Sequence, residues 1–172
     1  MRNALFIAAL AVAATAAPAF AQSTASVETT GTTQIIRPIA IQQTSALAFG
    51  TIVRPLTGSS TITIGTGADT ASRTGTAVLL RGTTSRAKYV VRGEGAEVVS
   101  VNVPASFNMT KVGGTETLAV ALTRNPGGNL TLGSTLGNEG TANLDIGGSF
   151  DVASTTATGN YSGTFTVSVN YN

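Results

Sequence analysis

The sequence predicts an all-β domain, either a sandwich or a barrel, built from about nine short strands. Composition is the first reason: Thr, Ser, Gly, Val and Ala dominate, and charged residues make up only 10% of the chain. Thr and Val favour pleated, half-buried surfaces, and Gly favours turns. The second reason is a repeated alternation of apolar and polar residues, which is the period of a strand with one buried face. The third is the spacing of turn signals, at intervals of about 8–12 residues, with no convincing helical period after residue 21.

The first 21 residues are interpreted as a signal peptide that is removed on export. Arg2 supplies a basic start, an Ala-rich apolar run follows, and Pro18 ends it. The small-x-small pattern at 19–21 places cleavage between Ala21 and Gln22. A membrane anchor is the alternative, but spanning a bilayer takes about 20 apolar residues, more than this run offers. We therefore expect an exported protein with no membrane span after cleavage.

Residues 22–34 are polar and Thr-rich, and they are expected to form an extension ahead of a single β-domain at 35–172. Small or apolar residues sit at alternate positions along the extension. This pattern suits either a loose leader or a strand that waits for a partner. The alternate positions are Ala25, Val27, Thr29, Gly31, Thr33 and Ile35.

Five expected strands fill the first half of the domain, each an alternating or apolar run between turn residues. Pro38 confines the first strand to an edge or a kink, because proline has no N–H to donate to a central ladder. Gly50 marks a bend or bulge in the second. The five strands are expected at 35–43, 46–53, 60–67, 75–82 and 87–93.

The second half continues the pattern. The strongest turn signal of the chain is NPGGN at 125–129, and Gly147-Gly148 indicates a bulge or turn inside the strand that contains it. The last strand alternates most clearly of all and carries two tyrosines and a phenylalanine on one face. The expected strands are 97–104 with a continuation at 106–110, 117–124, 142–152 and 161–171.

The chain lacks the residues that most enzymes and metal sites need. It contains no His and no Cys, which removes the commonest general base, the commonest metal ligand, the thiol nucleophile and any disulfide. Without Arg2, nine basic residues face eight acidic ones, and no basic stripe with stacking aromatics suggests nucleic-acid binding. We expect no enzymatic activity, no cofactor and no metal.

Three weaker signals were weighed against this expectation. Two carboxylate pairs, Glu94 with Glu97 and Asp145 with Asp151, resemble acid–base couples or calcium ligands, but they lie at strand ends where acidic residues usually solvate turns. The Gly-rich run at 65–75 resembles a phosphate loop, but no helix follows it to meet a phosphate. A hairpin connection explains that run better.

The terminal strand raises a problem of its own. An unpaired strand edge presents free N–H and C=O groups to other chains, and natural proteins protect such edges with charges or prolines. The segment 159–172 has neither, so we expect its edge to be used for interaction. The residues expected on its interacting face are Gly159, Tyr161, Gly163, Phe165, Val167, Val169 and Tyr171.

Several short motifs carry a resemblance to known families. Pro38-Ile39, the LAFG run at 47–50, Gly147-Gly148 and the ending GNYSGTFTVSVNY at 159–171 resemble DUF4402, a domain of unknown function found in secreted bacterial proteins. The ending also resembles fibre subunits of the chaperone–usher route, which carry a glycine fourteenth from the C-terminus and a penultimate tyrosine, here Gly159 and Tyr171. LAFGTI at 47–52 is similar to the early strand of spore coat U-like, archaic pilins. Those pilins usually hold a disulfide, which this chain cannot form.

The pilin resemblance implies an immunoglobulin-like sandwich that lacks one strand. In such subunits a periplasmic chaperone fills the gap in transit, an outer-membrane usher assembles the fibre, and the N-terminal extension of the next subunit becomes the donor strand. The resemblance thus implies a homopolymeric surface fibre (a fimbria or pilus) assembled by donor-strand complementation at the cell surface, with a role in adhesion. The alternative is a stand-alone secreted sandwich that binds a glycan or another surface component.

Overall fold

The computed structural model describes residues 24–172, and these divide between a unit that ends at Gln34 and a compact domain from Ile35 to Asn172. The predicted signal peptide and its Ala21–Gln22 cleavage site lie outside the described residues. Residues 24–34 form neither helix nor strand, and all of them are exposed.

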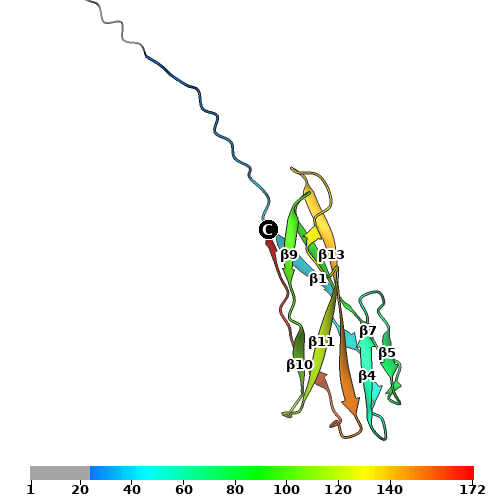
Figure 1. Cartoon of the computed structure of the whole chain (residues 1–172). Coiled ribbons are helices and arrows are strands. Elements are labelled where there is room, and N and C mark those ends of the chain that lie inside the picture. The colour runs from blue at the N-terminus through cyan, green and yellow to red at the C-terminus, as the bar shows by residue number, and fades with distance from the viewer. Residues whose placement is uncertain (1–23) are drawn as a thin grey trace, which may run out of the picture. The chain divides into compact units, whose positions relative to one another are not determined.

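The domain is all-β and sandwich-like, which confirms the predicted fold class. No helix occurs among residues 24–172, and every strand pair formed there is antiparallel. Figure 1 shows the strands along the domain. They are β1 (Ala40–Ser45), β2 (Ala48–Phe49), β3 (Ile52–Val53), β4 (Ser59–Ile64), β5 (Ala71–Thr74), β6 (Val78–Leu79), β7 (Thr84–Ser85), β8 (Ala87–Glu94), β9 (Val98–Asn102), β10 (Ser106–Lys111), β11 (Thr117–Asn125), β12 (Leu130–Thr131), β13 (Glu139–Ala153), β14 (Tyr161–Ser162) and β15 (Ser168–Tyr171).

One large sheet and one small sheet make up most of the domain. The large sheet has the order β1-β8-β13-β11-β10-β14, and β4 joins it through β13 and carries β5 on its other side. The small sheet has the order β12-β9-β15, and two short ribbons pair β2 with β7 and β3 with β6. The chain passes from the small sheet into the large one at 103–105, which includes Pro104. The C-terminal segment makes the reverse passage, because β14 pairs with β10 and β15 with β9.

The longest strand, β13, belongs to two neighbourhoods. Its first half, Glu139–Ile146, pairs with β8, and its second half, Gly148–Ala153, pairs with β4. At the changeover, a side chain on Gly147 would collide with the backbone carbonyl of Ile64. A Cβ on Gly148 would lie 3.0–3.2 Å from side-chain atoms of three core residues. The glycine pair therefore permits close packing within a continuous strand, and the bulge or turn expected there is wrong.

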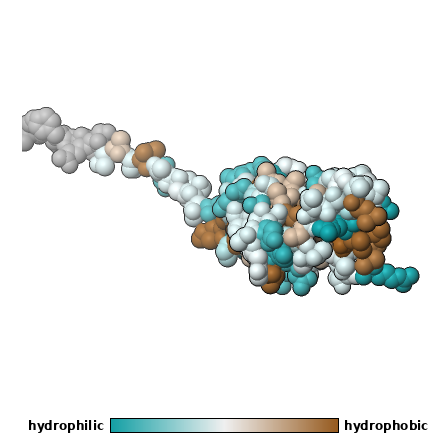
Figure 2. Space-filling view, turned by 90° about the horizontal axis from the view of Figure 1, so that it is seen from below, coloured by the Kyte–Doolittle hydropathy of each residue, from teal (hydrophilic) through white to brown (hydrophobic). Residues whose placement is uncertain are grey.

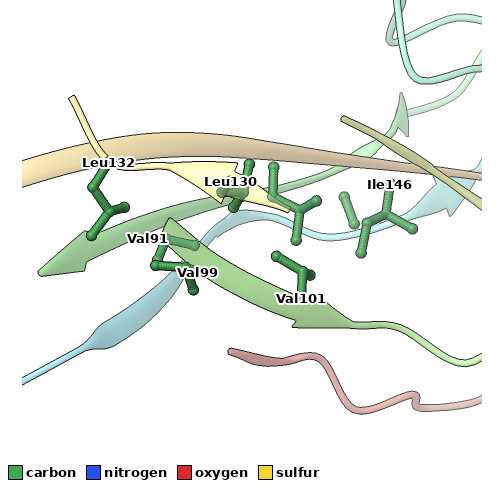
Figure 3. Close-up of a cluster of buried hydrophobic side chains, with 8 residues drawn as sticks. Val91, Val99, Val101, Leu130, Leu132 and Ile146 are labelled. Atoms are coloured by element: carbon green, nitrogen blue, oxygen red, sulfur yellow. The ribbon is translucent and has the colours of Figure 1, made fainter. Parts of the chain in front are cut away.

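Two clusters of buried apolar residues fill the interior. Figure 3 shows the first, which we call the upper core, with side chains from β8, β9, β12 and β13 directed toward one another. Its members are Ala87, Val91, Val99, Val101, Leu130, Leu132, Leu144 and Ile146. The second, the lower core, comprises Phe49, Ile62, Ile64, Ala77, Val120, Phe150 and Val152, with Phe49 and Phe150 in edge-to-face contact at 4.8 Å between ring centroids.

Two expected strands are mostly absent or interrupted in the structure. Residues 75–82 contribute only β6, whereas part of the expected hairpin connection forms β5 along β4. The expected strand at 161–171 is real at both ends but interrupted at 163–167. There the segment bypasses the bend between β9 and β10, and Phe165 packs on Phe107 instead, with ring centroids 5.0 Å apart.

Candidate docking groove over the lower core

The first and last strands of the domain meet at one end. The Tyr171 hydroxyl donates a hydrogen bond to the carbonyl of Arg37 at 2.9 Å and accepts one from the backbone N–H of Glu94 at 2.7 Å. This end, where the domain begins at Ile35 and ends at Asn172, is called the root end. A Cβ on Gly93 would collide with the Tyr171 hydroxyl, so the bare backbone there makes room for the tyrosine.

A buried carboxylate fixes the root end. The side chain of Glu94 is 3% exposed and accepts hydrogen bonds from the backbone N–H of Gly137 and from the backbone and guanidinium of Arg37, the latter at 3.1 Å. The Gly137 N–H, and after it the bonds and charge of Arg37, hold the pKa of Glu94 below its ordinary value. The first residues of the domain are thus tied to the end of β8 by the Arg37–Glu94 ion pair as well as by the hydrogen bonds of Tyr171.

A groove of about 800 Å³ lies toward the opposite end of the domain. One wall is the stretch 47–54, which contains β2 and β3, and the other is the start of the C-terminal segment at 156–161. The end of the domain that holds this groove is called the groove end. Arg54 reaches across it and donates to the carbonyl of Thr156 at 2.7 Å.

The floor of the groove is the lower core. Phe49, Phe150 and Val152 lie between 5% and 8% exposed, and Met109 and Leu118 are half-buried beside them. The lining is therefore mostly apolar and belongs to the domain interior. A site of this composition suits an apolar segment of another chain better than a charged small molecule.

The strands that border the groove each pair with a single partner among residues 24–172, which leaves one backbone edge of each free. On one wall β2 pairs only with β7 and β3 only with β6, and on the other β14, at the end of the large sheet, pairs only with β10. Between β14 and β15, residues 163–167 belong to no strand. Main-chain N–H and C=O groups at such edges can pair with an added strand.

The predicted interacting residues of the C-terminal segment divide into two groups. Gly159 and Tyr161 line the groove, while Phe165, Val167, Val169 and Tyr171 pack on the upper core. Gly163 lies so close to the carbonyl of Asn108 that a side chain would collide with it. The segment thus connects the groove with the upper core, although it is not one continuous strand.

The candidate donor residues lie in the exposed extension. Ala25, Val27, Thr29, Gly31 and Thr33 have no strand partner among the described residues, and Ile35, the first residue of the domain, is 90% exposed. Sequence reasoning missed the groove residues Met109 and Leu118, which it had placed on ordinary strands. Their alternation indicated burial, but alternation cannot indicate whether the covering strand is present.

The expected setting of the two carboxylate pairs is wrong in part. Asp145 and Asp151 lie inside β13 and not at a strand end, and Glu94 is buried. Asp145 pairs with Arg86 at 3.1 Å, and Asp151 accepts a hydrogen bond from Thr61. A smaller polar hollow of about 220 Å³ lies on the outer side of β8, beside Arg86 and Lys88. Among residues 24–172, no group of three or more acidic side chains is placed to hold a metal ion. Nor does this part of the chain contain a helix long and apolar enough to cross a membrane.

Comparison with known proteins identifies one family. A family model described as "Domain of unknown function (DUF4402)" matches residues 39–171, which includes both walls of the groove. No curated protein and no solved structure matches the chain.

Proposed function

The chain belongs to the DUF4402 family, and from that premise and the open groove we propose that it is a structural subunit of a surface fibre assembled by donor-strand complementation. The observation that carries the proposal is the groove itself: an apolar floor drawn from the domain core, with free strand edges on both sides. A strand from another molecule would cover the floor and pair with these edges.

The donor in this proposal is the extension at 22–34 of a neighbouring copy. Its alternate positions carry small or modest side chains, of which Val27 is the largest before the domain begins. Such a strand relies on main-chain hydrogen bonds for affinity, with Val27 filling one part of the floor. Gly31 would pass the narrowest point, since it has no side chain.

The proposal extends to the assembly route. A subunit with an uncovered core needs protection before it polymerises, so we propose a periplasmic chaperone that fills the groove in transit and an outer-membrane usher that exchanges it for the extension. The proposed route also includes export through the predicted signal peptide and delivery to the cell surface. Genes for such a chaperone and usher beside this gene would support the route.

The decisive experiment compares three proteins. The first is the domain 35–172 alone, and the second is the same domain with residues 22–34 joined after Asn172 through a short Gly/Ser linker. The third carries Val27→Asp in that joined strand. We expect the joined strand to raise the melting temperature by about 10 °C and the Val27→Asp version to lose most of that gain.

The alternative function predicts the opposite pattern. A stand-alone sandwich that binds a glycan or another surface component would be a monomer with two-state unfolding as the bare domain, and the joined strand would leave its melting temperature unchanged. A chain without 22–34 that still polymerised would also overturn the proposal.

A further inference from the structure

The groove end of the domain exposes apolar side chains beyond the groove. Leu56 is 98% exposed, and Val53 and Val78, which pair across the β3–β6 ribbon, are about half exposed. Arg54 and the adjoining loop hold this region against the start of the C-terminal segment. Figure 2, which looks at this end of the domain, shows hydrophobic surface gathered on one side of it.

The root end exposes a second apolar set. Ile35 is 90% exposed, and Ile36 and Leu136 are exposed to lesser degrees. Leu136 belongs beside the first residues of the domain because the guanidinium of Arg37 donates to the carbonyl of Gly137 at 2.9 Å. Apolar side chains thus mark both ends of the domain.

The direction of a donor strand decides which ends meet. A donor strand that ran parallel to the C-terminal segment would end at the root end of the acceptor, so the root ends of the two domains would face each other. The acceptor's own extension also begins at its root end, so the donor's domain would block that extension from reaching a third copy. If the donor runs antiparallel, it leaves at the groove end, and both outer ends of the pair stay free. Only this head-to-tail contact can repeat without closing.

The lengths leave room for only a short linker. From Gln22 to Ile35 the extension spans 13 steps, about 43 Å when extended. The border that it would follow, Tyr161 to Tyr171, spans ten steps, about 33 Å. A fully seated donor therefore brings Ile35 to the groove end of the acceptor with about three residues to spare, close enough for the two domains to be in contact.

We propose that neighbouring copies in the fibre bind each other through a second interface, in which Val53, Leu56 and Val78 at the groove end of one domain pack against Ile35, Ile36 and Leu136 at the root end of the next. This inference rests on the proposed function. The occupant of the groove-end apolar surface is a second copy of this chain, and its burial makes the fibre stiff instead of a string of loosely tethered domains.

The chain contains no cysteine, so engineered disulfides give a clean test. The full-length exported chain is prepared with Ile36→Cys and Leu56→Cys together, incubated until it polymerises and then oxidised. We expect a ladder of disulfide-linked multimers on a non-reducing denaturing gel. The matched control combines Ile36→Cys with Ala121→Cys, an exposed position in the middle of β11, and should give no ladder.

Other outcomes separate the two proposals. Polymers that form without an Ile36–Leu56 ladder overturn the second interface and leave donor exchange standing. Dimers linked by Ile36→Cys alone indicate root-to-root packing and also overturn it. If the unmodified chain forms no polymers, the proposed function fails, and this inference fails with it. As a second measure, Leu56→Asp should shorten the polymers several-fold, whereas Ala121→Asp should not.

Discussion

The upper and lower cores contain similar residues but are covered differently. In the upper core, side chains from the large sheet meet a second sheet, and β9, β12 and the C-terminal segment close it. The lower core has the same large sheet beneath it, but above it lie only the short β2–β7 and β3–β6 ribbons and the groove. Sequence alternation is equally clear in both. What differs is the cover over each core, which is a second sheet on the upper core and short ribbons beside a groove on the lower core.

The largest effect on stability is expected from shortening a side chain in the upper core. Leu144 is fully buried in the upper core, so Leu144→Ala should lower the free energy of unfolding by about 3 kcal/mol, through lost burial and the cavity left behind. Denaturant unfolding should give the same loss with and without the joined donor strand. A loss that depended on the donor would erase the distinction between the two cores.

The boundary between the cores should respond next most strongly. Gly147→Ala places a methyl group against the backbone carbonyl of Ile64, which cannot move aside without disturbing the β4–β13 pairing. We expect a cost of about 2 kcal/mol, typical of overpacking. Gly127→Ala, in a loop with open space around it, is the control and should be near neutral in the same assay.

The effect of a substitution in the groove should depend on whether a donor strand covers it. Leu118 is half-buried at the floor of the groove. Leu118→Ala should therefore lower the free energy of unfolding of the bare domain by only about 1 kcal/mol. In the donor-joined protein the side chain is covered more completely, and the cost should roughly double. Equal costs in the two proteins would show that the added strand does not reach the groove.

The smallest effect is a pH dependence confined to the root end. The pKa of Glu94 is lowered in the folded domain, chiefly by the Gly137 N–H and then by Arg37. Its contribution is therefore complete above the unfolded pKa, about 4.3, and is lost as the pH falls through the lower folded value. Melting temperatures between pH 7 and pH 3 should fall less steeply for Glu94→Gln than for the unchanged domain. Glu139→Gln removes a carboxylate from an exposed ion pair with Arg92 and is the control for Glu94→Gln in this measurement.

The sequence predicted the all-β class and most strand positions because alternation and turn residues report burial directly. The residue pattern alone did not predict the groove, which only the pilin resemblance implied, because the alternation of Leu118 and Val120 in β11 is the same whether or not a strand covers them. The Gly147-Gly148 pair indicates a bulge or turn by sequence alone, since a sequence cannot show that the neighbouring Ile64 carbonyl excludes a side chain at Gly147. The role of Glu94 was missed for a similar reason: its partners, Arg37 and Gly137, are far away in the chain.

The passage of β13 through both cores makes the proposed donor binding measurable along a single strand. Backbone amides at 139–146, held between a closed core and β8, should exchange with deuterium slowly at all times. Those at 148–153 lie beside the groove, and under the proposed function they should exchange faster in the bare domain than in the donor-joined protein. Exchange rates along this one strand would thus measure whether the groove is filled, with the first half of the strand as an internal reference.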